Sequence, residues 1–432
     1  MPLKHTVEEI TLKNGAKGLI IDVPDSTVVS YNIHFRAGNE YANPDVHQTA
    51  HLMEHLAFGS NEKFATAEEF SQEFKKNGAY SNAFTSDRDM NYVAAAAVME
   101  FDRILDLMEL SITKPKYKQE MLDTEKGNVR EELTGNANDH SRVMWQRIWK
   151  SMGGKSLMDS EKIETLDRVK LSNIKEHHHK THVLRNMRFT IAGDLLRHKD
   201  LIVKKLNGWD LPSGERLPVI KKTYKSSPVV HIHRKEMSNL TFAFNMVIHR
   251  ELTRSERVSM GALVHILTGT FHSRIFGKAR SMGICYGMGS GFYTDIAGTS
   301  GWNFHGRVGI DNAEALFRLI VSQLIKVVSG DISADELAAA KQYAIGGYQM
   351  RGQTVDALSG WYSSDYFDKE IIDPLELSPE YIKAITRNDM VKLAKEFIND
   401  SVWTLGGIGN ITKQQMQAHY NQLAQLFENR VK

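Results

Sequence analysis

The sequence is poor in cysteine, in proline and in net charge. Cys285 is the single cysteine among 432 residues, so one chain can form neither a disulfide nor a thiolate zinc site, and a reducing compartment is natural. The 54 basic residues nearly balance 52 acidic ones, which disfavours a nucleic-acid binder that works by neutralising phosphates. With 41% hydrophobic residues and only 9 prolines, the chain has the composition of a folded protein rather than a disordered one.

Long apolar runs are also absent. No segment approaches the roughly 18 uninterrupted apolar residues that span a membrane, and the longest smooth run, residues 92–99, ends at Glu100. The first ten residues have neither the apolar core of a signal peptide nor an Arg- and Ser-rich transit pattern. We therefore expect a cytoplasmic protein without a membrane span, unless a leader has been removed.

Patterns of strands followed by helices occur twice. Strand patterns begin each half, at residues 8–37 and 229–249, and helical stretches follow before a closing strand at 188–192 and at 402–409. Neighbouring strands joined by hairpin turns favour an α+β fold over a doubly wound parallel sheet. The sequence predicts two similar sandwich-like domains, each an antiparallel or mixed sheet packed by helices, at residues 1–210 and 228–432 with a linker at 211–227.

One short motif carries the chemistry. His51, Glu54 and His55 lie within one helical pattern, and at 100° per residue all three side chains share one face. Two histidines one turn apart can bind one metal ion, and the glutamate beside them can hold a water. This is the inverted H-x-x-E-H zinc-hydrolase pattern. His47 also lies one turn before His51, but a 47/51 pair would leave Glu54 away from the metal.

A catalytic zinc needs a third protein ligand and one open position. The long helical pattern at residues 116–134 offers Glu125, Glu131 and Glu132. Glu125 and Glu132 are two turns apart and share a face, so one can bind the metal while the other orients a ligand. Periodicity alone does not choose between Glu131 and Glu132.

The motif and its surroundings resemble the M16 metallopeptidases, the group of pitrilysin, insulin-degrading enzyme and mitochondrial processing peptidase. Glu132 follows His55 by 77 residues, within the run EKGNVREE. The resemblance extends to LKNG at 12–15, to NGAYSNAFTS at 77–86, to the strand ending AGD at 192–194 and to TFHSRIF at 270–276. The half-sized, two-domain chain is similar to the M16B subgroup. In one departure, Gln48 stands where the family pattern has glycine.

The resemblance implies roles at matching positions. His51, His55 and Glu132 would bind one Zn²⁺ per chain, Glu54 would be the general base, and Glu125 would support the site. Asn82 and Ala83 would lie on an edge strand that an extended substrate joins. Arg280 and Tyr286, from a C-terminal domain without the zinc motif, would contact the substrate. The spacing from Arg280 to Tyr286 is six residues where the family has seven, so Arg280 matches less well.

Three other features resemble functional sites but have simpler explanations. Three consecutive histidines, 177–179, diverge by 100° each on a helix, so with His182 they predict a solvated helix end rather than a metal site. The glycine-rich run at 287–291 lacks the Lys-Ser/Thr of a phosphate loop and predicts a strand that another backbone approaches closely. Cys285 is expected to be a small buried hydrophobic residue.

The sequence thus predicts a zinc metalloendopeptidase that cleaves peptides or unfolded segments inside a closed chamber, with Glu54 activating a zinc-bound water. Because the family's chamber brings a second domain to the zinc domain, we expect a homodimer, or a heterodimer with another M16 chain. Alternatives are a catalytically silent structural or partner subunit and a dedicated processing peptidase. A lyase of the S-ribosylhomocysteine type shares the motif, but those chains are much shorter and use a catalytic cysteine.

Overall fold

The computed structural model describes residues 2–428, which form two compact units that are not simply the two halves of the chain. Within the described residues, the first unit comprises 2–135, 159–219 and 349–376, and the second comprises 136–158, 220–348 and 377–428. The division at 219–220 falls inside the expected linker, 211–227. The expected boundaries, 1–210 and 228–432, do not include two exchanged helical segments. Residues 136–158 of the first half belong to the second unit, and residues 349–376 of the second half belong to the first unit.

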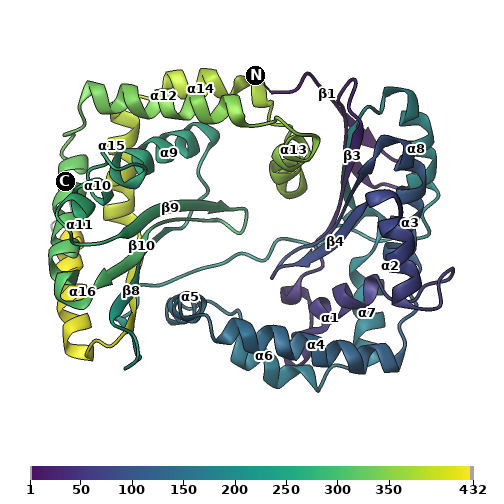
Figure 1. Cartoon of the computed structure of the whole chain (residues 1–432), viewed down its shortest axis with the longest axis horizontal. Coiled ribbons are helices and arrows are strands. Elements are labelled where there is room, and N and C mark those ends of the chain that lie inside the picture. Colours follow the sequence, from purple (N-terminus) through teal and green to yellow (C-terminus); the bar gives the residue numbers. More distant parts are fainter. Residues whose placement is uncertain (1, 429–432) are drawn as a thin grey trace. The chain divides into compact units, whose positions relative to one another are not determined.

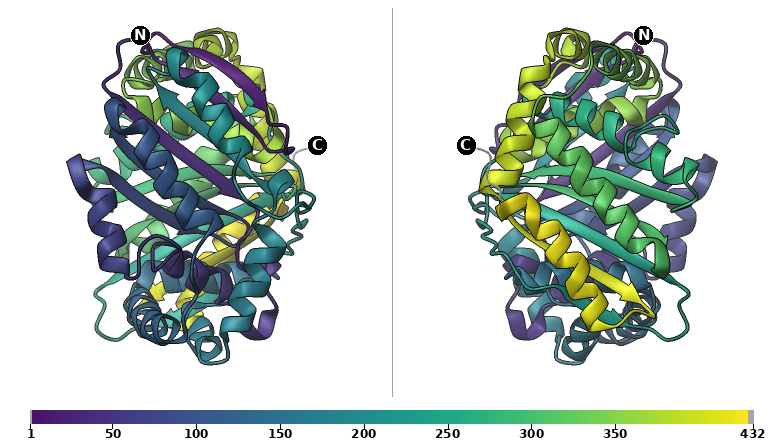
Figure 2. Two further views of the ribbon diagram at one scale, coloured as in Figure 1. Left: turned by 90° about the vertical axis from the view of Figure 1, so that its right-hand side faces the viewer. Right: turned by 90° about the vertical axis from the view of Figure 1, so that its left-hand side faces the viewer.

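The first unit is built on a six-stranded mixed sheet with the order β1-β2-β6-β3-β5-β4 within the described residues. Its elements are β1 (Thr6–Thr11), β2 (Lys17–Asp22), β3 (Val28–Phe35), α1 (Thr49–Ala57), α2 (Ala67–Lys75), β4 (Tyr80–Thr85), β5 (Met90–Ala97), α3 (Phe101–Thr113), α4 (Gln119–Ala137), α6 (Asp159–Leu166), α7 (Leu171–Thr181), β6 (Arg188–Gly193), α8 (Lys199–Asn207) and α13 (Val355–Lys369). Figure 2 (left) shows helices of this unit, purple to teal, in front of its strands.

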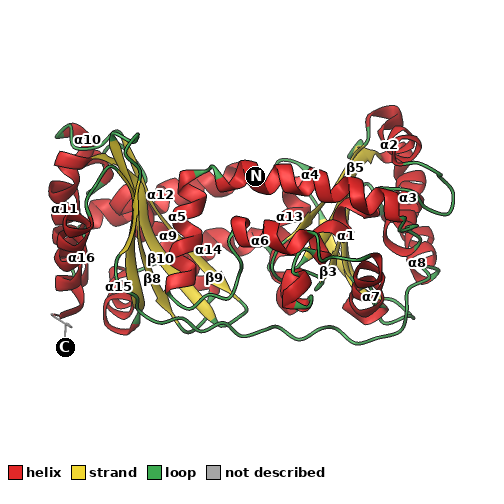
Figure 3. Cartoon of the chain, turned by 90° about the horizontal axis from the view of Figure 1, so that it is seen from below, coloured by secondary structure: helices red, strands yellow, loops and turns green. Residues whose placement is uncertain are grey.

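The second unit is built on a sheet with the order β7-β11-β8-β10-β9 in the same part of the chain. Its elements are α5 (His140–Ser151), β7 (Val230–His233), β8 (Asn239–Ile248), α9 (Arg254–Thr268), α10 (Phe276–Ser281), β9 (Gly287–Asp295), β10 (Thr299–Gly309), α11 (Ala313–Val328), α12 (Ala334–Met350), α14 (Ser378–Ala384), α15 (Arg387–Asp400), β11 (Val402–Gly409) and α16 (Lys413–Glu428). Figure 3 shows the strands nearly edge-on, with α11 and α16 on one side.

Five strands of the first sheet, β2-β6-β3-β5-β4, have the topology of the second sheet, as the repeated sequence pattern predicts, and β1 is an additional edge strand. In each sheet, the last strand of the unit inserts between two earlier ones: β6 pairs parallel with β2 and antiparallel with β3, and β11 pairs parallel with β7 and antiparallel with β8. The hairpins β4–β5 and β9–β10 are antiparallel. The α+β prediction with two similar domains is therefore confirmed.

The exchanged helices occupy matching places on the two sheets. In the first unit, α13 packs on β6, β3 and β2 (Figure 1). In the second, α5 packs on β11, β7 and β8, where Met144, Ile148 and Met152 form a small core with Ala243 and Val247. Strand β8 has buried residues on both faces because α5 covers one face and the main helical layer covers the other.

None of the helices within residues 2–428 combines the length and the hydropathy needed to cross a bilayer.

Candidate metal centre

The three side chains predicted to bind metal meet at one point of the first unit. His51 and His55 project from α1, one turn apart, and their rings lie edge to face with centroids 4.9 Å apart. Glu132 projects from α4, and its Oε2 lies 3.3 Å from Nε2 of His51 and 3.7 Å from Nε2 of His55. One ligand atom from each of the three residues lies within 4.8 Å of the others.

These distances fit a zinc ion. Zinc with nitrogen and oxygen ligands at about 2.0–2.1 Å in tetrahedral geometry separates neighbouring donor atoms by about 3.4 Å. The separations of 3.3 and 3.7 Å between the Glu132 oxygen and the two histidine nitrogens bracket that value. Two imidazoles and one carboxylate are also the donor set of a catalytic zinc site, which keeps a further position open. The geometry selects Glu132, which periodicity alone did not separate from Glu131.

Glu125 lies where it can hold a histidine in place. Its Oε2 accepts a hydrogen bond of 2.9 Å from Nδ1 of His55, which leaves Nε2 of that ring to face Glu132. This hydrogen bond lowers the pKa of Glu125, against the opposing effect of burial. Burial acts to lower the pKa of His55, but the Glu125 hydrogen bond and the nearby carboxylates outweigh it and raise that pKa. The arrangement fixes the ring and makes its free nitrogen a better ligand.

Glu54 lies on the same helix as the two histidines. Burial raises its pKa, and the negative charge of Glu132 adds to this, while Thr85 and the two imidazoles act in the opposite direction. A carboxylate whose pKa is raised toward neutrality can both accept and return a proton, which is the property of a general base that later acts as an acid.

The edge strand β4 carries the residues expected to meet an extended substrate. Strand β4 pairs only with β5 within the described sheet, so its other side is an edge. The backbone N–H of Ala83 donates to the side-chain oxygen of Asn82 at 2.9 Å. A free strand edge can pair with an added peptide through main-chain hydrogen bonds.

Arg280 and Tyr286 lie together in the second unit. The Arg280 guanidinium lies 4.6 Å from the centre of the Tyr286 ring, and its Nη1 donates to the Tyr286 carbonyl oxygen at 2.9 Å. The Phe271 ring lies 5.0 Å from the same guanidinium, a contact that the sequence analysis did not find. The Tyr286 side chain is 85% exposed. The six-residue spacing therefore still brings Arg280 and Tyr286 into contact.

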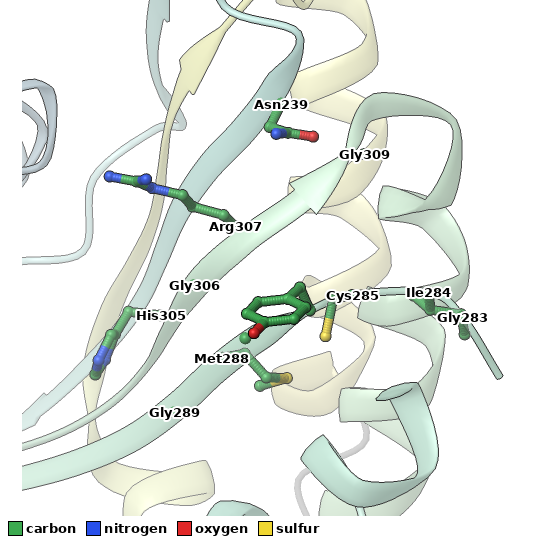
Figure 4. A pocket seen from close by; sticks show the side chains of 12 residues that line it. Asn239, Gly283, Ile284, Cys285, Met288, Gly289, His305, Gly306, Arg307 and Gly309 are labelled. Atoms are coloured by element: carbon green, nitrogen blue, oxygen red, sulfur yellow. The ribbon is translucent and has the colours of Figure 1, made fainter. Parts of the chain in front are cut away.

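A pocket of about 630 Å³ adjoins Tyr286 in the second unit. In Figure 4 the side chains of Cys285 and Met288 lie near each other on one side of it, and Arg307 extends from β10 on another. Cys285 is 7% exposed, as expected for a small buried hydrophobic residue, and burial raises the pKa of its thiol. The glycine-rich run at 287–291 forms part of strand β9, as predicted. The expected close approach of another backbone is wrong, because a Cβ atom at Gly287 would meet nothing within 4 Å and one at Gly289 or Gly291 would meet only a side chain.

The prediction of a solvated helix end is wrong for His177, His178 and His182, which are buried or half-buried, and it holds only for His179, which is exposed. His177 and His182 are buried. His177 donates to the Ala37 carbonyl oxygen and His178 to that of Ile112, both at 2.8 Å, while His182 Nε2 lies 2.8 Å from the Tyr92 hydroxyl. Burial lowers the pKa of His177 to about 4. These histidines are structural links between elements, a role that no local sequence pattern signals.

Comparison with known protein families identifies the family of the chain. The model of insulinase, peptidase family M16, matches residues 19–161, and that of the M16 inactive domain matches residues 168–343. The chain belongs to peptidase family M16. An uncharacterized zinc protease of Rickettsia felis is 23% identical over 417 residues, covering 94% of this chain and 98% of that protein.

Two further relatives widen the comparison. The probable β subunit of the mitochondrial-processing peptidase of Arabidopsis thaliana is 20% identical over 45% of this M16 chain and 38% of its own length. The crystal structure of a protease from Helicobacter pylori matches with a TM-score of 0.80 at 20% identity, covering 94% of this chain and all of that one. At this identity the structural match shows a shared fold.

Proposed function

We propose that this M16 chain is a zinc-dependent metalloendopeptidase that hydrolyses peptides or unfolded segments. The observation that carries the proposal is the convergence of ligand atoms from His51, His55 and Glu132 within 4.8 Å, next to Glu54 on the helix α1 that carries the two histidines. The M16 family match and a relative named as a zinc protease support it.

His51, His55 and Glu132 would hold the zinc, which when bound supplies a Lewis acid that polarises the scissile carbonyl and acidifies water. Glu125 keeps His55 oriented toward the ion through its hydrogen bond to Nδ1. Glu54 accepts a proton from the attacking water and passes it to the leaving nitrogen, for which its raised pKa suits it.

The substrate would join the first sheet at β4. An extended peptide added beside Asn82 and Ala83 gains main-chain hydrogen bonds that do not depend on its side chains, which suits an enzyme acting on varied unfolded segments. To pair with it, the Ala83 N–H exchanges the Asn82 side chain for a substrate carbonyl, and the freed amide can then bind the substrate backbone.

Arg280 and Tyr286 would complete the site from a second M16 domain. The exposed Tyr286 hydroxyl is a donor suited to the oxyanion of the tetrahedral intermediate, and Arg280 keeps the ring in place from its face. We propose that this domain comes from a partner chain in a homodimer or in a heterodimer with another M16 chain, and that the two chains enclose the substrate in a chamber.

The alternatives are a silent partner subunit and a dedicated processing peptidase. The first is raised by the M16 inactive-domain match, and the second by the mitochondrial-processing relative. The complete H-x-x-E-H motif and the converging third ligand favour activity over the silent subunit.

The deciding experiment measures zinc content and cleavage of a mixed peptide library for wild type and Glu54→Gln. We expect one zinc per chain in both proteins and a rate about 10²–10⁴-fold lower in the variant, the contribution typical of a general base. Glu131→Gln, at an exposed position of α4 beside Glu132, is the matched control and should cleave like wild type. Equal cleavage by Glu54→Gln contradicts the assigned base, and inactive wild type, even with candidate partner chains, favours the silent subunit.

A further inference from the structure

Gln48 is a buried side chain that contacts one of the histidines of the metal centre. It stands at the N-cap position of α1, where a short polar side chain usually bonds the first free backbone N–H groups. Its side chain makes no such bond and is 1% exposed. Its two polar atoms instead bridge two histidines: Oε1 lies 3.1 Å from Nδ1 of His51, and Nε2 lies 2.9 Å from Nδ1 of His47.

This bridge bears on which nitrogen of His51 carries the proton. Nε2 of His51 faces Glu132 at 3.3 Å, so it is the nitrogen available to a metal and must present a lone pair. The ring proton is then on Nδ1, and it donates to Oε1 of Gln48. An amide turned the other way would offer N–H groups to Nδ1 and favour the tautomer with its proton on Nε2, which cannot bind a metal through Nε2.

His47 decides which way the amide turns. With a lone pair on Nδ1, it accepts a hydrogen bond from Nε2 of Gln48 and so directs Oε1 toward His51. His47 is itself buried, which keeps water from competing for that amide. The two metal-site histidines are thus held differently, His55 by the carboxylate of Glu125 and His51 by a neutral amide.

We propose that Gln48 is a positioning residue that holds His51 in its metal-binding tautomer, with His47 fixing the orientation of the amide. The inference rests on the proposed zinc function and adds a residue to it. Since the family pattern has glycine at this position, the bridge is a feature of this chain that the family motif does not supply.

The test compares wild type with Gln48→Met, Gln48→Glu and His47→Leu. Met keeps the size of the side chain and removes both polar atoms, whereas Glu keeps an acceptor facing Nδ1 of His51. Zinc affinity is measured by competition with a chelator, and the His51 tautomer by ¹⁵N NMR of metal-free protein labelled at histidine, with His51→Asn assigning the signal. Gln323→Met, which removes a buried glutamine in α11 of the second unit, is the matched control.

We expect Gln48→Met to bind zinc at least tenfold more weakly, the usual cost of losing a group that orients a metal ligand. Its His51 should shift toward the tautomer protonated at Nε2. Gln48→Glu should retain most of the zinc affinity, and Gln323→Met should match wild type. His47→Leu should lose less affinity than Gln48→Met, because the Gln48 amide is still present but can then take either orientation.

Each outcome bears on one hypothesis. If wild type itself fails to bind one zinc per chain, the proposed function fails, and this inference with it. If wild type binds zinc and Gln48→Met binds equally well with an unchanged tautomer, the positioning role is overturned while the function stands. If Gln48→Met lowers the melting temperature of the metal-free protein, its weaker zinc binding could reflect poor folding, and the comparison then uses folded Gln48→Glu. If Gln48→Glu loses as much zinc affinity as Gln48→Met, the positioning role is overturned.

Discussion

Glu370 ties the exchanged helix α13 to the first sheet, and removing its charge should loosen that helix. Glu370 directly follows the last residue of α13. Its carboxylate accepts a hydrogen bond from Nζ of Lys17 on β2, at 2.7 Å, and two from Arg188 on β6, one from Nε at 3.1 Å and one from Nη2. The Arg188 side chain is only 5% exposed. Glu370→Gln leaves this buried guanidinium without its counter-ion while keeping the size of the side chain.

The expected cost follows from the carboxylate's environment. Burial acts to raise the pKa of Glu370, but the hydrogen bonds and charges of Lys17 and Arg188 outweigh it and lower that pKa to about 2, from an ordinary 4.5. A shift of this size corresponds to about 3 kcal/mol. Because the carboxylate is 30% exposed, solvent screening reduces the value, and we expect the helix to lose about 2 kcal/mol.

Hydrogen–deuterium exchange followed by mass spectrometry measures this locally. Peptides covering residues 355–369 should exchange about 30-fold faster in Glu370→Gln at pH 7, since about 1.4 kcal/mol is a factor of ten. Peptides of α5, the matching helix of the second unit, should be unchanged. Glu336→Gln, which breaks the comparable ion pair with Arg274 in the second unit, is the matched control and should leave 355–369 protected.

The sign of the pH dependence is also fixed. Because the folded pKa of Glu370 is depressed, its stabilisation is full above about pH 4.5 and is lost as the pH falls through 2. The difference in exchange rate at residues 355–369 between wild type and Glu370→Gln should therefore become smaller below pH 4.5. Unchanged exchange at 355–369, or a difference that grows as the solution is acidified, would refute the assignment of this ion pair.

Two further predictions concern the metal centre and its completion. Glu125→Gln removes the charge that holds His55 and should weaken zinc binding about 10–100-fold in a chelator competition; unchanged affinity would show that the hydrogen bond does not orient the ligand. Mixing inactive Glu54→Gln chains with inactive Tyr286→Phe chains should restore about one quarter of the wild-type activity. Half of the randomly formed dimers contain one chain of each variant, and each such dimer has one of its two sites intact, with Glu54 from one chain and Tyr286 from the other. No recovery after verified subunit exchange would exclude a site shared between identical chains.

The local geometry of the metal centre could be predicted because a helix has a fixed period. His55 follows His51 by four positions and Glu132 follows Glu125 by seven, which already puts each pair on one helix face. The choice of Glu132 over Glu131 could not come from the sequence without a family resemblance, because it depends on how α4 is turned against α1. The sequence shows Gln48 only as a departure from the family glycine, because its bridge between His47 and His51 depends on side-chain directions that spacing does not encode.

The exchange of α5 and α13 could not be predicted for a different reason. Met144, Ile148 and Met152 follow one another at intervals of four, which predicts an apolar helix face but not the sheet that it covers. Both sheets offer a similar apolar face, so the pattern fits either. The contacts that decide, such as Ile148 against the backbone of Gly406 in β11, join residues more than 250 positions apart.

The shared topology of the two units separates scaffold from chemistry. Helix α9 follows β8 as α1 follows β3, yet α9 contains one histidine, His265, and no H-x-x-E-H motif. Within residues 2–428, the ligand cluster of His51, His55 and Glu132 is the one group with metal-binding spacing, and it belongs to the first unit. The second unit instead presents its exposed Tyr286 just before the edge strand β9. Under the proposed function, a fold that places a helix and an edge strand at the same points twice would assign the metal to one copy and substrate contact to the other, because a few side chains on equivalent elements set the chemistry.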